Sequence, residues 1–232
     1  MRKSFRLILF FLLLSGAILS FRAAVIYSFN QLYLASRITR KTYWFGIPTL
    51  QAPTDMWAMQ EIITELKPDY IVESGAYLGG SALFFATVLE HVNPEGKVIT
   101  IDLSDFRRWG YDASEFPVFR KRVEFMRGDS VSPAVVGKIR QEVTGRVMVF
   151  LDSNHRKEHV LKELELYGPL VSVGSYLILH DTNRGPHLFL NRFGPFGAVQ
   201  EFLFKHTNFE LDHTREKFLL TYSPSGYLKR IS

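Results

Sequence analysis

The sequence predicts an α/β fold of the Rossmann-like class: a seven-stranded, mostly parallel sheet with helices on both faces and a C-terminal antiparallel hairpin. Three observations predict it. Short apolar runs alternate along the chain with longer segments of helical periodicity, which is the pattern of βα units. Two of these runs, Arg146–Asp152 and Ser175–His180, are apolar almost throughout, as is typical of strands covered on both faces of a parallel sheet. The chain then ends with two apolar segments, Phe209–Asp212 and Phe218–Ser223, which we expect to form the hairpin.

The remaining elements follow one another after residue 41. A helix is expected over Pro53–Pro68, because apolar residues recur there every three or four positions and Thr54 or Asp55 could cap its first turn. The other expected strands are Asp69–Glu73, Lys97–Asp102 and Val123–Arg127, and the other expected helices are Ser81–His91, Pro133–Val143, Lys157–Leu166 and Ala198–His206. In such a sheet ligands bind beyond the carboxyl ends of the strands, so polar residues at these ends are the candidates for a site.

Composition and charge divide the chain into residues 1–41 and a single domain over residues 42–232. The chain has 232 residues and a net charge of +5, but residues 1–41 carry seven basic residues and no acid. About −2 is left for the rest, so the basic charge flanks an apolar segment and favours lipid head groups over nucleic acid. The absence of cysteine excludes disulfides, thiolate zinc sites and a cysteine nucleophile.

The N-terminal segment predicts a membrane attachment. Leu7–Phe21 contains 15 uncharged, mostly apolar residues after a basic start. A helix of that length spans ~22 Å, less than the ~30 Å hydrocarbon core of a bilayer, but the apolar pattern resumes after Arg22 and continues to Phe29. A retained anchor is favoured; a cleaved signal peptide and a buried helix remain alternatives. Basic residues on both sides of the run leave its orientation open.

A glycine-rich turn, Glu73–Ser81, joins the first strand of the domain to its helix. Gly75 permits a sharp turn and Gly79 allows the backbone to approach a ligand. The glycine spacing Gly75-x-x-x-Gly79 is not that of dinucleotide-binding enzymes, and the lysine of a P-loop is missing. Because Glu73 precedes the turn, the site suits the ammonium and sulfonium charges of S-adenosylmethionine (SAM) better than a phosphate. An ordinary βα turn is the alternative.

Two further strand ends fit a nucleoside. Asp102 ends the second strand, where its carboxylate could accept both ribose hydroxyls; this favours a nucleoside cofactor without separating SAM from NAD. Asp129 and Ser130 follow the third strand and could reach the adenine, or could cap the next helix.

Asp152 and Asp181 predict a metal site. They end neighbouring expected strands, which in a parallel sheet lie ~4.8 Å apart, so the two carboxylates could share one divalent cation such as Mg²⁺. His180, Thr182 or Asn183 could complete the ligand set. Asp152 could instead cap the following helix.

His155 is the candidate general base. A bound cation lowers the pKa of a coordinated hydroxyl, and a neighbouring histidine with an ordinary pKa near ~6.5 can remove its proton before the methyl group is transferred in line. His155 and His159 are four residues apart, so a zinc pair or simple surface exposure are the alternatives.

At these residues the chain, from Tyr43 to Tyr227, resembles the cephalosporin hydroxylase / rhamnosyl O-methyltransferase family. The resemblance rests on IVESGAYLGGS, VITIDL, RGDSV, the run LDSNHRKEHVLKELELYGPLVSVGSYLILHDTN and the ending KFLLTYSPSGYLKR. It implies a SAM methyltransferase fold and O-methylation of sugars, lipids or natural products.

Gly75–Ser81 is also distantly similar to catechol-type O-methyltransferases. That likeness implies cofactor contacts from Gly75, Tyr77, Ser81 and Asp102, and metal contacts from Asp152 and Asp181. Thr182 stands where those enzymes have Asn and His155 where they have Lys, while His180 stands where the cephalosporin branch can carry an acid. The segment Arg184–Gly197 is shorter than the acceptor loop of the family.

We therefore expect a SAM-dependent, divalent-metal-assisted O-methyltransferase acting on a hydroxyl of a sugar, glycolipid or related small molecule. We expect it at a membrane, with its catalytic domain on the cytoplasmic side where SAM is made, and without a nucleic-acid partner; a homo-oligomer is left open. The alternatives are a membrane-associated protein that binds SAM without catalysis and, less favoured by the glycine spacing, an NAD-dependent oxidoreductase.

Overall fold

The computed structural model describes the backbone of residues 2–183 and 194–232, and the side chains of residue 18 and of residues 20–183 and 194–232. The chain divides into two compact units, Met1–Ile38 and Thr39–Ser232, which are described separately. The predicted acceptor loop lies mostly outside the described residues.

The first unit is a single helix, α1 (Arg2–Ser36), which ends at Arg37 in the left-handed region of the backbone (φ 53°). Within the side chains that the structure describes, no helix combines the length and the apolar character needed to cross a membrane. The expected membrane segment Leu7–Phe21 lies largely outside those side chains, so the membrane attachment stays a prediction.

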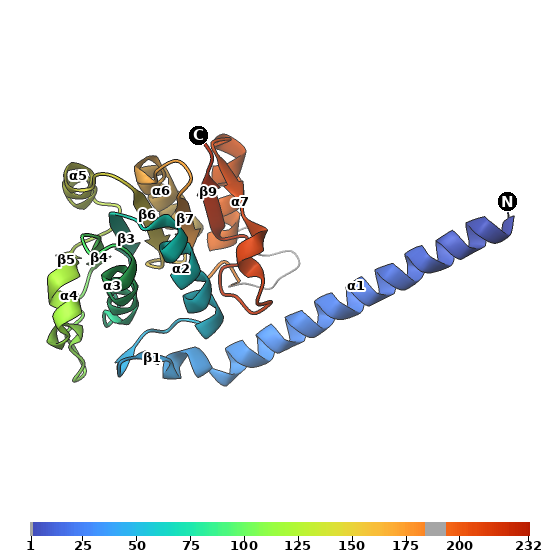
Figure 1. Cartoon of the computed structure of the whole chain (residues 1–232), viewed down its shortest axis with the longest axis horizontal. Coiled ribbons are helices and arrows are strands. Elements are labelled where there is room, and N and C mark those ends of the chain that lie inside the picture. Colours follow the sequence, from blue (N-terminus) through green and yellow to red (C-terminus); the bar gives the residue numbers. More distant parts are fainter. Residues whose placement is uncertain (1, 184–193) are drawn as a thin grey trace. The chain divides into compact units, whose positions relative to one another are not determined.

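The second unit is built on a seven-stranded sheet in the order β5-β4-β3-β6-β7-β9-β8 (Figure 1). The first five strands in this order pair in parallel, and β9 and β8 close the edge as an antiparallel pair. Their bounds are β3 (Tyr70–Ser74), β4 (Lys97–Asp102), β5 (Val123–Arg127), β6 (Val147–Leu151), β7 (Tyr176–Leu179), β8 (Phe209–Leu211) and β9 (Tyr227–Arg230). The predicted fold class is confirmed.

Successive residues of each strand point to opposite faces of the sheet, and both faces are covered. In β6, Met148 and Phe150 face one core and Val147, Val149 and Leu151 face the other. The first core is closed by α2 (Pro53–Leu66), α3 (Gly80–Val92) and α4 (Pro117–Arg122), and the second by α5 (Pro133–Glu142), α6 (Lys157–Tyr167) and α7 (Pro195–Lys205) (Figure 1). This double cover is why the strands are apolar without alternation.

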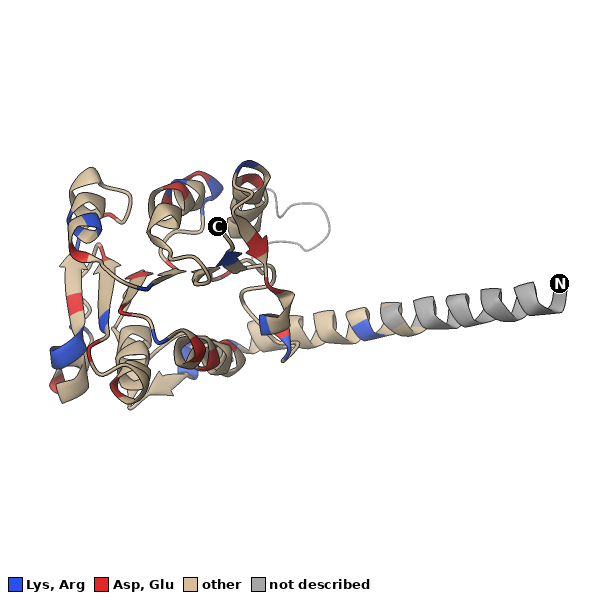
Figure 2. Ribbon diagram, turned by 45° about the horizontal axis from the view of Figure 1, so that its top comes forward, with Lys and Arg blue, Asp and Glu red and all other residues tan. Residues whose placement is uncertain are grey.

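Short elements complete the unit. They are the hairpin of β1 (Tyr43–Trp44) and β2 (Ile47–Pro48), and the 3₁₀ turns η1 (Ile38–Lys41), η2 (Ala113–Glu115), η3 (Gly168–Leu170) and η5 (His213–Glu216). Acidic and basic residues are interspersed over the helices and strands of the second unit (Figure 2). Many of them pair, as Lys121 does with Glu90, Lys138 with Glu124 and Arg215 with Glu65.

The predicted cap of the first helix and the predicted last strand are both wrong, and Asp55 is involved in both. The helix α2 has no side-chain cap: its N-cap is Ala52, and Pro53 opens its first turn. Asp55 is instead buried, accepting hydrogen bonds from the hydroxyls of Thr221 and Tyr227 and from the backbone N–H of Tyr222. These bonds hold Thr221 and Tyr222 away from the sheet, so the last strand is β9 rather than Phe218–Ser223.

Candidate active site

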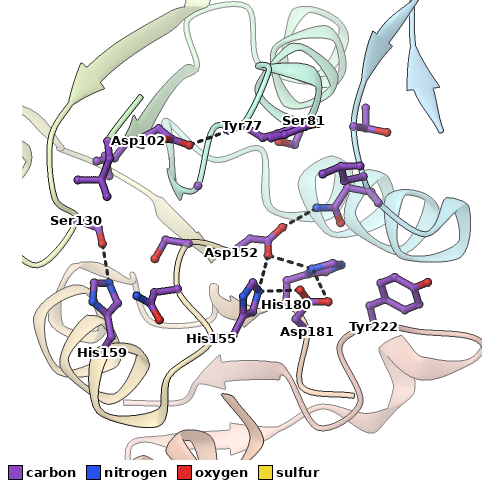
Figure 3. A pocket seen from close by; sticks show the side chains of 18 of the residues that line it. Tyr77, Ser81, Asp102, Ser130, Asp152, His155, His159, His180, Asp181 and Tyr222 are labelled. Carbon is purple, nitrogen blue, oxygen red and sulfur yellow. Dashed lines mark hydrogen bonds and ion pairs between the residues drawn. The ribbon is translucent and has the colours of Figure 1, made fainter. Parts of the chain in front are cut away.

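A cavity of about 330 Å³ opens at the carboxyl edge of the sheet. Its walls come from the segments that follow β3, β4, β5, β6 and β7 and from residues 49–51, which precede α2. Since the carboxyl ends of parallel strands meet at one edge, residues from five separate βα connections line one space. Figure 3 shows Asp102, Tyr77 and Ser81 on one side of this space, with Asp152, His155, His180 and Asp181 gathered on the other.

The turn after β3 passes close to the end of β6. Gly75 has φ +97°, and a Cβ atom there would lie 2.1 Å from the carbonyl oxygen of Asp152. Only a glycine therefore lets the two strand ends lie together. The turn is further fixed by the backbone N–H of Tyr77, which donates to Oδ2 of Asp102 (2.9 Å).

Asp102 faces the cavity with both carboxylate oxygens anchored. Oδ1 accepts the backbone N–H of Ser104 (2.9 Å), and Oδ2 accepts that of Tyr77. A carboxylate has about four acceptor positions, so two remain for ligand hydroxyls. Arg108, which the sequence did not single out, donates to the carbonyl oxygen of Tyr77 (3.1 Å) and lies over the ring of Trp109.

Ser130 and His159 line the cavity beyond Asp102. Oγ of Ser130 lies 3.2 Å from Nε2 of His159 (Figure 3). The carboxylate of Asp129 accepts a hydrogen bond from the backbone N–H of Val131. The cap of α5 is Ser132, not Asp129 or Ser130, so both remain available to a ligand. The carboxylate of Glu163, which accepts a hydrogen bond from the imidazole, raises the pKa of His159 above its usual value, and partial burial opposes this effect.

The acids that follow β6 and β7 meet at the opposite end of the cavity. Ligand atoms of Asp152, His155 and Asp181 all lie within 4.8 Å of one another. Nε2 of His155 is 2.7 Å from Oδ2 of Asp181 and 3.6 Å from Oδ1 of Asp152. Nδ1 of His180 lies 3.2 Å from Oδ1 of Asp152 and 3.6 Å from Oδ1 of Asp181 (Figure 3). Two carboxylates and two imidazoles thus share one corner.

The ionisation of this corner follows from its charges. Burial opposes ionisation of Asp152, but the charge of His180 and hydrogen bonds from His155 and His180 outweigh it and lower the pKa of Asp152. Burial likewise opposes protonation of His180, yet Asp152 and Asp181 outweigh it and raise the pKa of His180 to about 9. The geometry therefore favours an ionised Asp152 at neutral pH.

Several predicted site residues lie elsewhere. The hydroxyl of Thr182 donates to the carbonyl oxygen of Pro224 (2.7 Å), and Thr182 does not line the cavity. Gly79 is the N-cap of α3, packed against Ala113 and Phe119 rather than against the cavity. The structure does not pair His155 with His159, because His155 precedes α6 and turns toward the acids while His159 meets Ser130.

Gln51 belongs to the site although no motif marks it. Its Nε2 donates to Oδ2 of Asp152 (3.0 Å), and its side chain is almost fully buried. Gln51 lies 101 residues before Asp152, so only the folded chain reveals the contact.

Glu73 lies beneath the cavity, not on its wall. It is fully buried, and the hydroxyl of Thr100 donates to its Oε2 (2.5 Å). Burial, only partly offset by hydrogen bonds from Ser81 and Thr100, raises the pKa of Glu73 to about 7.

This shift predicts a pH-dependent stability. A carboxyl with a raised pKa in the folded state stabilises that state while it keeps its proton, and the contribution is lost as the pH rises toward 7. We expect Glu73→Gln, which mimics the protonated acid, to gain about 3 kcal/mol in unfolding free energy relative to wild type between pH 4.5 and pH 8. Urea unfolding at four pH values would measure the difference in unfolding free energy between the variant and the wild type. Glu95→Gln, at an exposed position, is the control. Parallel curves for Glu73→Gln and wild type would show that Glu73 keeps an ordinary pKa.

Comparison with known proteins identifies relatives over nearly the whole chain. The family model "Rhamnosyl O-methyltransferase/CmcI" matches residues 36–231. A rhamnosyl O-methyltransferase of Mycobacterium leprae is 33% identical over 223 residues, covering 93% of this chain and 95% of the relative. A rhamnosyl O-methyltransferase of Mycobacterium tuberculosis is 34% identical over 216 residues, covering 89% of this chain and 85% of the relative.

Solved structures share the fold at lower identity. CmcI with Mg and SAM matches with a TM-score of 0.65 and 20% identity, covering 83% of this chain and 78% of that chain. An O-methyltransferase from Bacillus cereus in complex with SAH matches with a TM-score of 0.55 and 16% identity, covering 82% of this chain and 81% of that one. The family predicted from the sequence motifs is thereby confirmed: the chain belongs to the rhamnosyl O-methyltransferase/CmcI family.

Proposed function

We propose that this SAM-dependent O-methyltransferase methylates a hydroxyl group of a sugar, and that a divalent cation held by Asp152 and Asp181 assists the reaction. One observation carries the proposal. The two carboxylates and His155 meet at one end of a cavity whose other end is lined by Gly75, Tyr77 and Asp102. The cavity can thus hold a nucleoside cofactor and an acceptor hydroxyl side by side.

The cofactor end recognises SAM through its own polar groups. Asp102 accepts hydrogen bonds from the ribose hydroxyls, since its carboxylate is already oriented by two backbone N–H groups. Ser130, with Asp129, reaches the adenine from the segment after β5. Ser81 and the backbone of the Gly75 turn line the part that would receive the methionine end, while Glu73 supports this turn from beneath.

The acid corner fits a divalent cation. It offers carboxylate oxygens from Asp152 and Asp181 that are close enough to touch one ion, and His155 lies beside them. Nε2 of His180 is buried there without a hydrogen-bond partner among the described residues. Carboxylate oxygens suit Mg²⁺ and Mn²⁺. When bound, the cation lowers the pKa of the acceptor hydroxyl and orients it.

His155 is our candidate for the base. Of the two imidazoles in the corner it is the accessible one, with 31% of its side chain exposed against 2% for His180. Nε2 of His155 would take up the proton of the acceptor hydroxyl, and the neighbouring Asp181 would stabilise the resulting imidazolium.

The sugar acceptor itself is inferred from the rhamnosyl O-methyltransferase relatives. The basic and apolar residues 1–41 support attachment to a membrane, which fractionation of cells would test. The use of SAM, which is made in the cytosol, is what favours a catalytic domain on the cytosolic side.

The assay uses SAM with a labelled methyl group and a panel of glycosides that includes rhamnosides. We expect label in the sugar, loss of transfer after EDTA treatment, and recovery when Mg²⁺ or Mn²⁺ is added back. Transfer that persists in EDTA would exclude the metal role. Binding of SAM in calorimetry without transfer to any acceptor would favour a non-catalytic SAM-binding protein, and binding of NAD instead of SAM would overturn the assignment.

A further inference from the structure

Exposed aromatic side chains surround the β1–β2 hairpin, which lies beside α2 in the second unit (Figure 1). Tyr43 and Phe45 of the hairpin expose 52% and 59% of their surface, and Trp57 of α2 exposes 62%. Tyr43 and Trp57 line one groove, and none of the residues that line it is charged. We call Tyr43, Phe45 and Trp57 the aromatic patch. Single exposed aromatic residues are common, but neighbouring ones mark a surface that binds a partner.

The packing of the hairpin holds these rings at the surface. The ring of Trp44 meets the buried ring of Phe84 edge-on, with centroids 5.0 Å apart, and lies 5.1 Å from the ring of Phe45. At Gly80, the first residue of α3, a Cβ atom would come within 2.4 Å of the carbonyl oxygen of Pro48. The hairpin is therefore packed tightly against the start of α3, and the aromatic patch cannot turn inward without unpacking it.

Two basic residues lie directly before the hairpin. Arg40 and Lys41 end η1, are exposed, and form no ion pair with another of the described residues. At the surface of a bilayer aromatic rings lie at the level of the head groups, and basic side chains attract anionic lipids. Nucleic acid also binds aromatic and basic residues, but it is disfavoured because residues 42–232 carry a net charge of about −2.

The order of the chain also favours a bilayer as the partner. The apolar pattern of α1 ends at Phe29, and the helix from there to Ser36 rises ~10 Å. The backbone from Ser36 to Tyr43, where the hairpin begins, adds at most ~24 Å when fully extended. That length suffices for the aromatic patch to touch a membrane that holds the residues before Phe29. No such link brings a separate protein to this surface.

The aromatic patch lies at the edge of the sheet that carries the catalytic cavity. Thr49, directly after β2, lines that cavity, and α3, on which the hairpin packs, follows the carboxyl end of β3. Val173 has a similar exposure, 61%, but precedes β7 and so lies at the amino ends of the strands. The two edges can therefore be compared by labels at matched positions.

We propose that the aromatic patch docks into the head-group region of an anionic bilayer, with Arg40 and Lys41 on lipid phosphates, so that the edge of the sheet with the catalytic cavity faces the membrane. The inference rests on the membrane attachment in the proposed function, but not on the acceptor or the metal. It adds a fixed orientation to that attachment, because two contacts with a bilayer hold a domain that a single helix would leave free to turn.

The test uses the full chain, which has no cysteine, with one nitroxide label in each variant. Phe45→Cys carries the label in the aromatic patch, and Val173→Cys, the matched control, carries it at the opposite edge. Each variant is mixed with vesicles of phosphatidylcholine and phosphatidylserine. EPR then compares collisions of the label with oxygen, which is enriched in the bilayer, and with a nickel chelate, which stays in water. We expect the label at residue 45 to lie about 5–10 Å deep in the bilayer surface and the label at residue 173 to remain in water.

A second set of variants tests the charges. Arg40→Gln together with Lys41→Gln, in the labelled Phe45→Cys chain, should lower the ratio of inserted to free label about 25-fold, since each cation near an anionic surface strengthens binding about fivefold. Vesicles of phosphatidylcholine alone should give a similar loss. Lys67→Gln, which removes an exposed charge at the C-terminal end of α2, is the control and should leave the label inserted.

The outcomes separate the docking from the proposed function. If the chain floats with the vesicles but the label at residue 45 lies in water, the docking is excluded while attachment through the N-terminal segment stands. If the chain does not float, both fail. A label at residue 45 that is shielded from both reagents before vesicles are added would mean that a second copy of the chain covers the aromatic patch, which overturns the docking. Methyl transfer to a soluble glycoside tests the enzymatic activity independently of these results.

Discussion

Asp181→Asn is expected to lower kcat/KM for methyl transfer about 10³-fold. A cation that activates the acceptor supplies several kcal/mol of transition-state stabilisation, and each ~1.4 kcal/mol is a factor of ten in rate. Asp181 is well suited to the test because its backbone is left-handed (φ 58°), a conformation that asparagine tolerates as well as aspartate. The substitution removes the charge and replaces an anionic ligand with a weaker, neutral amide oxygen, without imposing backbone strain.

Three measurements separate loss of the metal from loss of the fold. Transfer of the labelled methyl group gives kcat/KM, and calorimetry gives the affinity for SAM. Thermal unfolding with and without Mg²⁺ shows whether the ion binds. We expect SAM affinity within about threefold of wild type, since Asp102 and Ser130 are unchanged. We also expect little or no stabilisation by Mg²⁺, since the ion would lose one of its two anionic ligands. Asp105→Asn, which removes an exposed carboxylate paired with Arg107, is the control. Retention of a tenth or more of wild-type kcat/KM, with Mg²⁺ still stabilising, would exclude Asp181 as a ligand.

The strands could be predicted from sequence because their signal is local. Lys97–Asp102 coincides with β4, since a strand buried on both faces needs an apolar run bounded by polar residues. Val123–Arg127 coincides with β5, although this edge strand is only partly buried. The last strand could not be placed in the same way. Phe218–Ser223 is as apolar as β9, but Asp55, more than 160 residues away, binds Thr221 and Tyr222 and excludes them from the sheet.

The candidate site likewise contains residues that sequence could predict and residues that only the folded chain reveals. Topology brings Asp152 and Asp181 together, because neighbouring parallel strands end at one edge. Topology does not fix the direction of a side chain. Thr182 turns to Pro224 and His155 turns to the acids, although both stand within three residues of a predicted ligand. Gln51 comes from a segment with no recognisable motif, so its contact with Asp152 follows only from the packing of α2.

Gly75→Ala is expected to destabilise the protein by about 3–5 kcal/mol, because a strained backbone costs about 1–3 kcal/mol and an overpacked contact a similar amount. The backbone at Gly75 has φ +97°, and the added Cβ would lie 2.1 Å from the carbonyl oxygen of Asp152. Backbone atoms cannot rotate away as a side chain can, so the ends of β3 and β6 must separate. In a domain of this size each kcal/mol lowers the melting temperature by about 2–4 °C, so a decrease of roughly 10 °C is expected in calorimetry.

Gly110→Ala separates the two causes. Gly110 has a similar backbone (φ +80°) but nothing within 4 Å of the added Cβ, so it carries the strain without the collision and should cost less than half as much. The collision also displaces Asp152, and a shift of about 1 Å at a reacting group can reduce the rate about 100-fold. Gly75→Ala should therefore lose methyl transfer even at temperatures where it is fully folded, whereas Gly110→Ala should not. Equal losses of stability in the two variants would mean that the turn after β3 does not need its close approach to Asp152, and the acid corner would then owe its geometry to β6 and β7 alone.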